Sequence, residues 1–442
     1  MIDMEKQNKY RVGIIGGGVA GISAANELIK YPEVEVTILE KTTALGGLNQ
    51  CVELDGLKYD IGTFLYPNDH ALLMTFPFLR EIYLPIEHYP IAVKDKDKID
   101  VHPISIKGYW KNHGTINFIL SIWSLLFAKI KNRNIKTLPQ YCEYYLGERI
   151  YKKSGLKSYI KRLYKKDDTE VDLKFGYARI KEFKNYSLRN IIKRLGKLDG
   201  DFIFNAKKRT FYARPDSGFK IAFDRLEDHL KTNNVSIFKN INISHIEKKA
   251  QGFKVNTNED SYYFDRIIAT IPFSITQKLL GLQTNFTPSY MSLCTLFYTG
   301  KSKHDTNVIY NYTEEGEWKR ITLYSKYYGK HEGLDYISVE ITFNSKEQPN
   351  IAAYKSEFEK LTSKYDIIKD LKFTGQKITP YAYPLFNKGE IDLADKELDG
   401  IRAFGIDLVG RQGTFEYLSS DDTILTTQAY MRDSFIPTLL PL

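Results

Sequence analysis

Residues Tyr10 to Gly21 read YRVGIIGGGVAG, and residues Ile38 to Leu48 read ILEKTTALGGL. The first stretch is an apolar strand that runs into Gly16, Gly18 and Gly21 and then into a helical pattern. Glycines at these places permit a tight turn, a close approach of a pyrophosphate to the backbone, and close packing of the helix on the sheet. The helix N-terminus adds free N–H groups and the positive end of a dipole. The pattern therefore predicts an α/β fold with a dinucleotide site at its first turn.

An acidic residue follows the second predicted strand. Glu40 stands directly after Val34 to Leu39 and 24 residues after Gly16. A carboxylate at this place accepts hydrogen bonds from both ribose hydroxyls and repels a 2′-phosphate. The dinucleotide-binding residues predicted for this unit are Gly16, Gly18, Val19, Ala20, Gly21, Glu40 and Lys41.

A second glycine pair separates FAD binding from NAD binding. Gly46-Gly47-Leu48 follows Glu40, and Tyr59-Asp60-Ile61-Gly62 comes shortly afterwards. This arrangement resembles the family of flavoproteins that contains amine oxidases, protoporphyrinogen oxidases, carotenoid desaturases and UDP-galactopyranose mutases. The resemblance implies FAD as the cofactor, with both segments beneath the flavin, where a flat ring leaves no room for side chains. The flavin contacts it implies are Gly46, Gly47, Leu48, Asp60, Ile61, Gly62 and Thr63.

The resemblance also implies two interleaved domains. A Rossmann-like FAD-binding domain with a parallel sheet is expected from residues 1–70, 206–275 and 395–442. A substrate-binding domain, with an antiparallel sheet and a helical insert, is expected from residues 71–205 and 276–394. Residues 71–205 show mostly helical patterns, and helices are expected at Thr137 to Leu146, Ser154 to Tyr164 and Asp172 to Phe183. The alternation from Met291 to about Phe343 predicts the antiparallel sheet. In the family, the residue at the position of Ile243 contacts the adenine through its backbone.

The segment GRQGTFEYLSSDD, which starts at Gly410, is a second strong signature. We predict a strand that ends at Gly410-Arg411, and a helix that is capped by Ser420-Asp421 and starts near Thr423. The N–H groups of that helix would point at the pyrimidine edge of the flavin, where negative charge collects on reduction. Arg411 would offer a charge-assisted hydrogen bond to a phosphate oxygen.

The same segment resembles the closing motif of UDP-galactopyranose mutases. In the mutases, the tyrosine that matches Tyr417 holds the pyrophosphate of the substrate, and the acidic position that matches Asp421 lies beside the flavin. A packed core tyrosine is the alternative interpretation of Tyr417. Arg179, Arg214 and Arg320 could also reach an anionic substrate, although a salt bridge is the commoner role for an arginine. The sequence names no catalytic residue.

Two departures weaken the mutase interpretation. Residues 62–66 lack the histidine that mutases carry beside the flavin, and Leu48 stands where mutases usually have Asn. The leading hypothesis is therefore a FAD-dependent oxidoreductase of the amine oxidase-like superfamily that transfers a hydride from its substrate to flavin N5. The alternative is a flavin-dependent nucleotide-sugar mutase in surface polysaccharide biosynthesis. A binding module that has lost its cofactor, like the GDP dissociation inhibitors, fits the intact glycines poorly.

The positive charge of the chain is concentrated in one region. The net charge is +9, and residues Lys129 to Lys166 alone hold twelve Lys or Arg and two acids. A solvated helical face and attraction of an anionic substrate or membrane surface are the main interpretations. Nucleic-acid binding is not expected, because no nucleic-acid-binding module is recognisable. The small-molecule substrate could be an anionic nucleotide sugar.

The most apolar stretch lies just before this basic region. Ile116 to Ile130 has 15 residues, fewer than the roughly twenty that a spanning helix needs. We predict a buried helix, with an amphipathic membrane segment as the alternative, so that residues 116–166 could give a peripheral membrane contact. The charged N-terminus and the three cysteines without a CxxC pair predict a cytoplasmic protein, and the scattered histidines predict no metal site.

Overall fold

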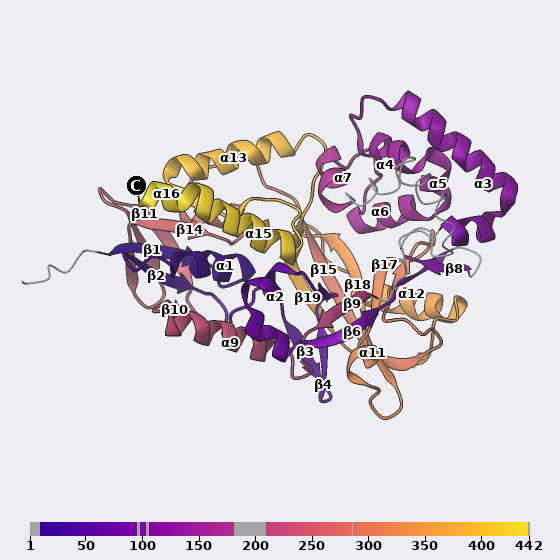
Figure 1. The fold of residues 1–442 in the computed structure, drawn as a ribbon, viewed down its shortest axis with the longest axis horizontal. Coiled ribbons are helices and arrows are strands. Elements are labelled where there is room, and N and C mark those ends of the chain that lie inside the picture. Colours follow the sequence, from indigo (N-terminus) through magenta and orange to yellow (C-terminus); the bar gives the residue numbers. More distant parts are fainter. Residues whose placement is uncertain (1–8, 95–97, 103–105, 181–208, 285, 441–442) are drawn as a thin grey trace, which may run out of the picture.

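The structure, a computed structural model, describes residues 9–94, 98–102, 106–180, 209–284 and 286–440. Two lobes make up the molecule (Figure 1). One is built on a parallel sheet, and the other on a larger sheet with a group of helices at one end. The first and last elements of the chain both lie in the first lobe, so the chain leaves that lobe and returns to it.

A five-stranded parallel sheet forms the centre of the first lobe. Its strands, in spatial order, are β10 (Ser236–Phe238), β2 (Val34–Leu39), β1 (Tyr10–Ile15), β14 (Arg266–Ala269) and β20 (Ile406–Leu408). The central strands are buried over most of their length, because both faces of a parallel sheet are normally covered. The predicted Rossmann-like α/β fold is confirmed.

Helices cover one face of this sheet, and a small sheet covers the other. Ile14 and Ile38 share a buried cluster with α1 (Val19–Leu28), α9 (Phe219–Thr232), α15 (Ser420–Tyr430) and α16 (Ile436–Leu439). The neighbouring residues Ile15 and Leu39 point to the opposite face, because side chains alternate along a strand. They belong to a cluster with the small sheet β11 (Ile243–Lys248), β12 (Phe253–Thr257) and β13 (Ser261–Phe264), and with α10 (Phe273–Leu279) and α13 (Ile391–Phe404).

A seven-stranded sheet forms the second lobe. Its strands, in spatial order, are β19 (Ile368–Pro384), β15 (Tyr290–Ser302), β18 (Asp335–Asn344), β17 (Trp318–Leu323), β16 (Val308–Asn311), β7 (Ile91–Lys94) and β8 (Lys98–Val101). All neighbours are antiparallel except β16 and β7, which are parallel. The predicted antiparallel sheet is confirmed, and α12 (Ile351–Lys364) packs on one of its faces.

Two small sheets and several short helices complete the lobes. The strands are β3 (Cys51–Leu54), β4 (Leu57–Asp60), β5 (Tyr66–Pro67), β6 (Leu84–His88) and β9 (Arg209–Ala213). The short helices are α2 (Ala71–Thr75), η1 (Pro77–Glu81), α11 (Ser325–Tyr328), α14 (Gly410–Gly413) and η3 (Met431–Phe435). Strands β6, β7 and β8 fall in residues 71–205, where the patterns were mostly helical. These strands are short, so they show too few residues for a period to be read from the sequence.

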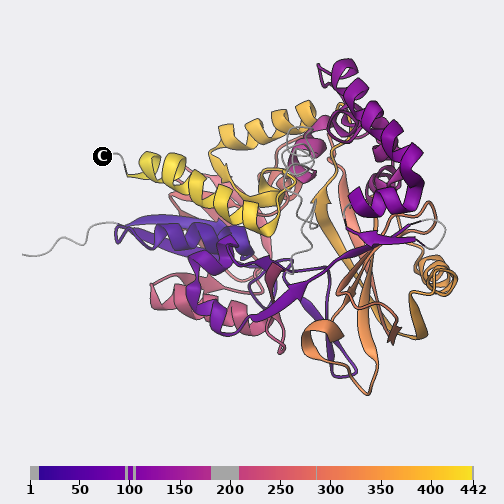
Figure 2. The ribbon, with the colours of Figure 1, turned by 45° about the vertical axis from the view of Figure 1, so that its right-hand side comes forward.

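The helical insert gathers at one end of the seven-stranded sheet (Figure 2). It contains α3 (Ile106–Lys131), α4 (Leu138–Leu146), α5 (Glu148–Lys153), α6 (Leu156–Tyr164) and α7 (Leu173–Arg179). Helices predicted from Thr137 and from Ser154 are confirmed. The helix predicted from Asp172 to Phe183 ends at Arg179, and residues 181–183 lie outside the described residues. The proposed division between the two domains stays a prediction.

The prediction of a buried helix at Ile116 to Ile130 is wrong in one respect. The segment is helical, as part of α3, but many of its apolar side chains lie in solvent. Phe127 and Trp123 are each 66% exposed, and Ile116 is 76% exposed. Within the described part of the chain, the portion of α3 from Gly108 to Lys131 is also the helix that meets the length and apolarity needed to cross a membrane.

One residue of the basic region is buried rather than solvated. Arg162 of α6 donates hydrogen bonds to four main-chain carbonyls, those of Asn311, Thr313, Glu315 and Gly316. These carbonyls belong to the last residue of β16 and to the turn between β16 and β17. Arg162 therefore fixes the helical insert to the seven-stranded sheet.

Candidate functional site

The two glycine-rich segments meet where no side chain fits. A Cβ on Gly47 would lie 3.1 Å from the Cα of Gly18, and a Cβ on Gly21 would lie 2.0 Å from the carbonyl oxygen of Gly16. Gly16 and Gly47 have φ values of +103° and +58°, which favour glycine. The turn after β1 and the turn after β2 are therefore in contact through bare backbone, at the N-terminus of α1.

Glu40 lies beside this contact. Its carboxylate accepts a hydrogen bond of 2.6 Å from the N–H of Gly17 and bonds of 2.8 Å from the N–H and hydroxyl of Thr42. The N–H of Ile241 donates to the Glu40 carbonyl oxygen at 2.9 Å, which brings the start of β11 and Ile243 close to Glu40. Glu40 is buried, and Lys41, which follows it, is exposed.

The C-terminal motif reaches the same place. A Cβ on Gly410 would lie 2.5 Å from the Cβ of Ala20 and 3.7 Å from the side chain of Thr423. Helix α15 starts at Ser420, earlier than the predicted start near Thr423, because Ser419 is the residue that caps it. Its hydroxyl accepts the N–H of Asp422 at 3.0 Å.

Two residues of this motif have contacts that differ from the expected ones. Asp421 accepts the N–H of Ala71 at 2.6 Å, so it caps α2. Arg411 donates to the carbonyl of Ala382 on β19 at 3.2 Å, and its guanidinium lies 5.0 Å from the ring centre of Tyr383. Arg411 thus faces the second lobe, and its contact with a phosphate stays a prediction.

Asp60-Ile61-Gly62, which we call the D-x-G segment, joins the two lobes. The hydroxyl of Thr295 on β15 donates to the Ile61 carbonyl oxygen at 2.7 Å. Leu48 is half-buried in the turn after Gly47, and the space beside Gly62 is bounded by the ring of Phe64 at 3.7 Å. These positions agree with a segment that lies between the dinucleotide turn and the sheet of the second lobe.

Arg214 is used inside the protein. Its Nε donates to Asp60 at 2.6 Å, and its other nitrogens donate to the carbonyls of Lys58, Pro215 and Asp216. The ring of Tyr328 lies over the guanidinium at 4.6 Å, and Arg214 is buried. We therefore correct its assignment: Arg214 holds the β3–β4 hairpin and Asp60, and it is not retained as a substrate ligand.

A buried cluster of charges lies at the centre of the second lobe. We call Lys319, Arg320 and Glu340 the β17 cluster. Arg320 forms two hydrogen bonds with Glu340, at 2.7 and 2.8 Å, and the ammonium of Lys319 lies 3.0 Å from the same carboxylate. Lys319 and Glu340 are almost completely buried.

A β-bulge explains how two consecutive residues reach one carboxylate. The pairing of β17 with β18 shifts between Trp318 and Arg320, so that Lys319 is the extra residue opposite Glu340. In a regular strand, neighbouring side chains point to opposite faces, and a bulge re-aims one of them. Lys319 was not identified from the sequence because alternation would have placed it on the other face. The signal that was available was Glu340, a charged residue within the apolar strand YISVEITF.

Several predicted residues surround the β17 cluster. The hydroxyl of Thr63 donates to Glu340 at 3.0 Å. The ring of Tyr383 lies 5.4 Å from the Lys319 ammonium and stacks on Tyr417 at 5.0 Å. Arg179 at the end of α7 interacts electrostatically with Tyr417. The structure therefore brings together Thr63, Arg179, Arg320, Arg411 and Tyr417, together with Lys319, Glu340 and Tyr383, which the sequence did not single out.

The cluster carries more positive than negative charge. Burial alone raises the pKa of Glu340, but Arg320 and Lys319 outweigh it and lower the pKa from 4.5 to about 2. Burial also raises the pKa of Tyr383, yet the charges of Lys319, Arg411 and Arg320 bring that pKa below its ordinary value. With Glu340 ionised, one positive charge of the β17 cluster is left over. The arrangement suits an anionic group.

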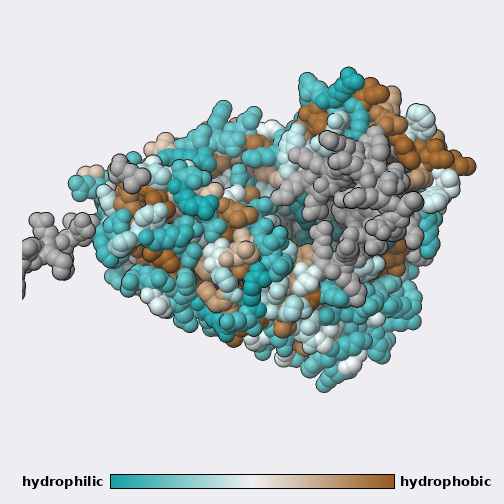
Figure 3. Space-filling model, in the orientation of Figure 1, coloured by the Kyte–Doolittle hydropathy of each residue, from teal (hydrophilic) through white to brown (hydrophobic). Residues whose placement is uncertain are grey.

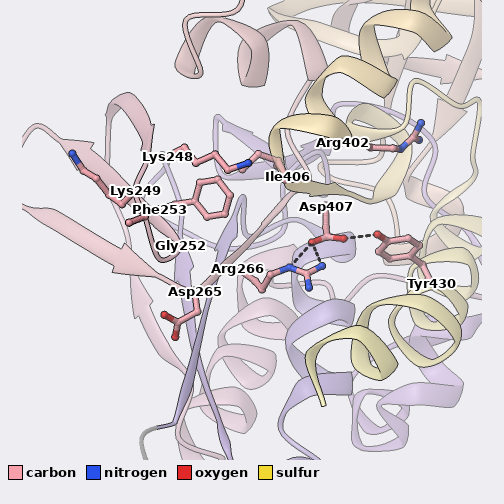
Figure 4. A pocket seen from close by; sticks show the side chains of 12 residues that line it. Lys248, Lys249, Gly252, Phe253, Asp265, Arg266, Arg402, Ile406, Asp407 and Tyr430 are labelled. Carbon is pink, nitrogen blue, oxygen red and sulfur yellow. Dashed lines mark hydrogen bonds and ion pairs between the residues drawn. The ribbon is translucent and has the colours of Figure 1, made fainter. Parts of the chain in front are cut away.

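A separate cavity lies at the outer edge of the parallel sheet (Figure 4). At its floor, Asp407 accepts hydrogen bonds from Arg266 at 2.8 Å and from the hydroxyl of Tyr430 at 2.5 Å. These bonds tie β14, β20 and α15 together. Because Arg266 and Asp407 are paired with each other and the glycine turns do not line the cavity, we assign it a structural role.

Comparisons with known proteins support the same fold. Residues 14–76 match the family described as NAD(P)-binding Rossmann-like domain. A carotenoid 3,4-desaturase of Haloarcula japonica is 34% identical over 97 residues, which is 20% of this chain and 19% of the desaturase. The match thus spans about a fifth of the relative's length.

Solved structures match over nearly the whole chain. A reduced UDP-galactopyranose mutase has a TM-score of 0.76 at 14% identity, and the match covers 98% of this chain and 94% of the mutase. A protein from Exiguobacterium sp. 255-15 described as a protoporphyrinogen oxidase has a TM-score of 0.69 at 14% identity, with 96% and 98% covered. The chain therefore has the fold of these solved proteins. The resemblance that the sequence motifs predicted is therefore confirmed.

The residues present fit FAD, the cofactor that the resemblance of the sequence motifs implies. The bare contact of Gly18 with Gly47 leaves the backbone open to a pyrophosphate, and the α1 N-terminus supplies N–H donors beside it. Glu40 is placed to accept ribose hydroxyls, since its carboxylate lies at the same turn. The contact of each individual residue with FAD stays a prediction.

Replacing Glu40 should weaken FAD binding. We expect Glu40→Ala to reduce FAD affinity by about 1–3 kcal/mol, roughly fivefold to 150-fold, because charge-assisted hydrogen bonds are lost. Equilibrium titration of apoprotein with FAD, followed by flavin fluorescence, measures the change. Glu35→Ala, on the exposed side of the same strand, is the control. Equal affinities for the two variants would refute the role of Glu40.

Replacing Glu340 should make the melting temperature depend less on pH in the acid range. A carboxyl whose folded pKa is lowered to about 2 stabilises the fold fully above its unfolded pKa of 4.5, and that stability is lost as the pH falls. Glu340→Gln should lower the melting temperature by roughly 5 °C at pH 7, since Lys319 and Arg320 lose their counter-charge. The difference from wild type should shrink between about pH 4.5 and pH 2.

The control for this measurement is Glu359→Gln, because Glu359 lies on the surface of α12. Its melting temperature should follow wild type at every pH. A constant difference between Glu340→Gln and wild type across the acid range would contradict the ionised state of Glu340.

Proposed function

We propose that this protein is a FAD-dependent oxidoreductase of the amine oxidase-like superfamily. The observation that carries the proposal is the meeting of Gly18, Gly47 and Gly410 around the N-terminus of α1. Three segments far apart in the sequence each place a glycine here, where the backbone has no side chain to cover it. An extended dinucleotide needs such exposed backbone to bind against. FAD bound at this place would supply its N5 atom as the acceptor of a hydride from a substrate C–H bond.

The residues of the first lobe would bind and orient this cofactor. The turn at Gly16 to Gly18 and the start of α1 would hold the pyrophosphate, and Glu40 the adenosine ribose. The backbone at Ile243 would contact the adenine. The N-terminus of α15 would direct its N–H groups to the pyrimidine edge, where they favour negative charge.

The residues of the second lobe would bind the substrate. The β17 cluster holds one positive charge in excess in a buried setting, where a charge has a stronger effect than in water. An anionic group of the substrate would neutralise that excess. The stacked rings of Tyr383 and Tyr417 would form a wall beside it, and Arg179 interacts electrostatically with both rings. We therefore propose an anionic small molecule as the substrate.

A nucleotide-sugar mutase is the second candidate function. Two observations favour it: the likeness to a UDP-galactopyranose mutase over 98% of the chain, and the excess positive charge, which suits a diphosphate. Leu48 and the absence of a histidine at residues 62–66 argue against it. In this alternative, the same Arg and Tyr residues would hold the diphosphate of the sugar nucleotide.

The redox state of the flavin distinguishes the two functions. An oxidoreductase should bleach its flavin absorbance anaerobically when substrate is added, and should consume an electron acceptor in proportion to product. The purified protein is to be screened against amines, hydroxylated acids and UDP-hexoses, once oxidised and once reduced with dithionite. Turnover of a UDP-hexose by the reduced protein without net oxidation would replace the first proposal by the second.

Replacing Lys319 should weaken anion binding without disturbing the fold. Lys319→Met leaves the paired charges of Arg320 and Glu340 and removes the excess charge. The dissociation constant for UDP or pyrophosphate should rise about 10-fold to 150-fold, while the flavin spectrum stays the same. Lys301→Met, at an exposed position of the same sheet, is the control. Unchanged anion affinity of Lys319→Met would refute the substrate site.

A further inference from the structure

Helix α3 exposes most of its large apolar side chains to solvent. The face that packs against α4 and α5 carries Ser121, Leu125 and Ala128, and Asn132 follows directly after the helix; all four are at most 3% exposed. The face toward solvent carries large apolar side chains that are between 42% and 76% exposed. We call this second set the α3 apolar face; it consists of Ile116, Ile119, Leu120, Ile122, Trp123, Phe127 and Ile130.

The contacts of the inner face show why its residues other than Leu125 are small or polar. A Cβ on Gly147 would lie 2.8 Å from the backbone of Leu125, so the helices are nearly in backbone contact there. The hydroxyl of Ser124 accepts the N–H of Arg149, and Asn132 donates to Glu143. The inner face is therefore covered by contacts with α4, α5 and the residues that connect them. Figure 3 shows the outer residues as an apolar area along the upper right edge of the molecule.

Positive charge lies around the α3 apolar face. Lys153 and Arg149 of α5 both donate to the side chain of Asn117, which puts their charges beside the N-terminal half of the apolar face. Lys131 follows Ile130 directly and is exposed. Further exposed cations of the same helical group are Lys111, Arg133, Lys136, Lys152 and Lys161.

We propose that the α3 apolar face docks on a lipid bilayer that contains anionic headgroups. Large apolar side chains would enter the boundary between headgroups and acyl chains, and the surrounding Lys and Arg would contact the headgroups. The helix would lie in the plane of the membrane rather than cross it. Gly114, with φ +78° and ψ 165°, interrupts α3. The continuous helix after it, residues 115–131, is about 25 Å long, which is short of the roughly 30 Å hydrocarbon core. One of its faces is also covered by α4 and α5.

The same charges favour a bilayer over a second copy of the chain. A symmetric dimer through the α3 apolar face would bring Lys131 and Lys153 of both copies to one interface, and like charges across an interface oppose association. Anionic headgroups instead complement them. An exposed apolar area rimmed by cations matches an interfacial membrane segment.

Vesicle sedimentation tests the proposal with the full-length protein. We expect binding to phosphatidylcholine vesicles that contain about one third phosphatidylglycerol, weaker binding without the anionic lipid, and weaker binding at high salt. The double variant Trp123→Ser, Phe127→Ser should bind at least about tenfold more weakly. The matched control is Tyr263→Ser, Leu393→Ser, which removes two exposed apolar side chains from the other lobe and should bind like wild type.

Tryptophan fluorescence gives a readout that does not depend on the variants. In Trp110→Phe, the remaining tryptophans are Trp123 and the buried Trp318, so that a blue shift on addition of vesicles reports Trp123. Lack of a shift together with no sedimentation would overturn the proposal. So would a lipid-independent dimer, seen by light scattering, that the Trp123→Ser, Phe127→Ser variant abolishes. Equal loss of vesicle binding in the control pair would also overturn it.

Discussion

Backbone contact without side chains is the constraint on which this molecule depends. The turn after β1, the turn after β2 and the turn after β20 converge on the start of α1. A Cβ at Gly21 would lie 2.0 Å from a carbonyl oxygen, and a Cβ at Gly410 would lie 2.5 Å from the side chain of Ala20. Such distances leave room for glycine alone. Because the three segments come from both ends of the chain, the parallel sheet must be complete before this place exists.

The first lobe contributes exposed backbone to the candidate site, and the second lobe contributes buried charge. The bulge in β17 turns Lys319 toward Glu340, so that two cations share one buried carboxylate. A buried ion pair is costly to form and is weak evidence for stability, so an excess charge in such a place calls for another reason. Thr63 connects the two parts, because it follows the D-x-G segment and donates to Glu340. The dinucleotide turn and the charge cluster therefore border the same segment of chain.

Local patterns predicted the first lobe well and the second lobe only in outline. The glycine spacing and Glu40 predicted the fold of β1, α1 and β2, since each motif has one steric meaning there. Lys319 was missed because a bulge depends on the partner strand and leaves no period in its own sequence. Arg214 was misassigned because its ligand Asp60 lies 154 residues earlier in the chain. The burial of α3 was misjudged because composition alone does not tell which face packs on the protein.

The helical insert links the charge cluster to the outer surface through a short series of contacts. Arg162 of α6 binds the turn that leads into β17, and Thr342 of β18 donates to the carbonyls of Arg162 and Leu163. Thr342 lies two residues from Glu340, and side chains two apart share one face of a strand. One end of α6 thus fixes both strands that form the β17 cluster. Helix α5 of the same group packs on α3 and leaves its apolar side outward. The helical insert therefore exposes the α3 apolar face and also positions the buried charges.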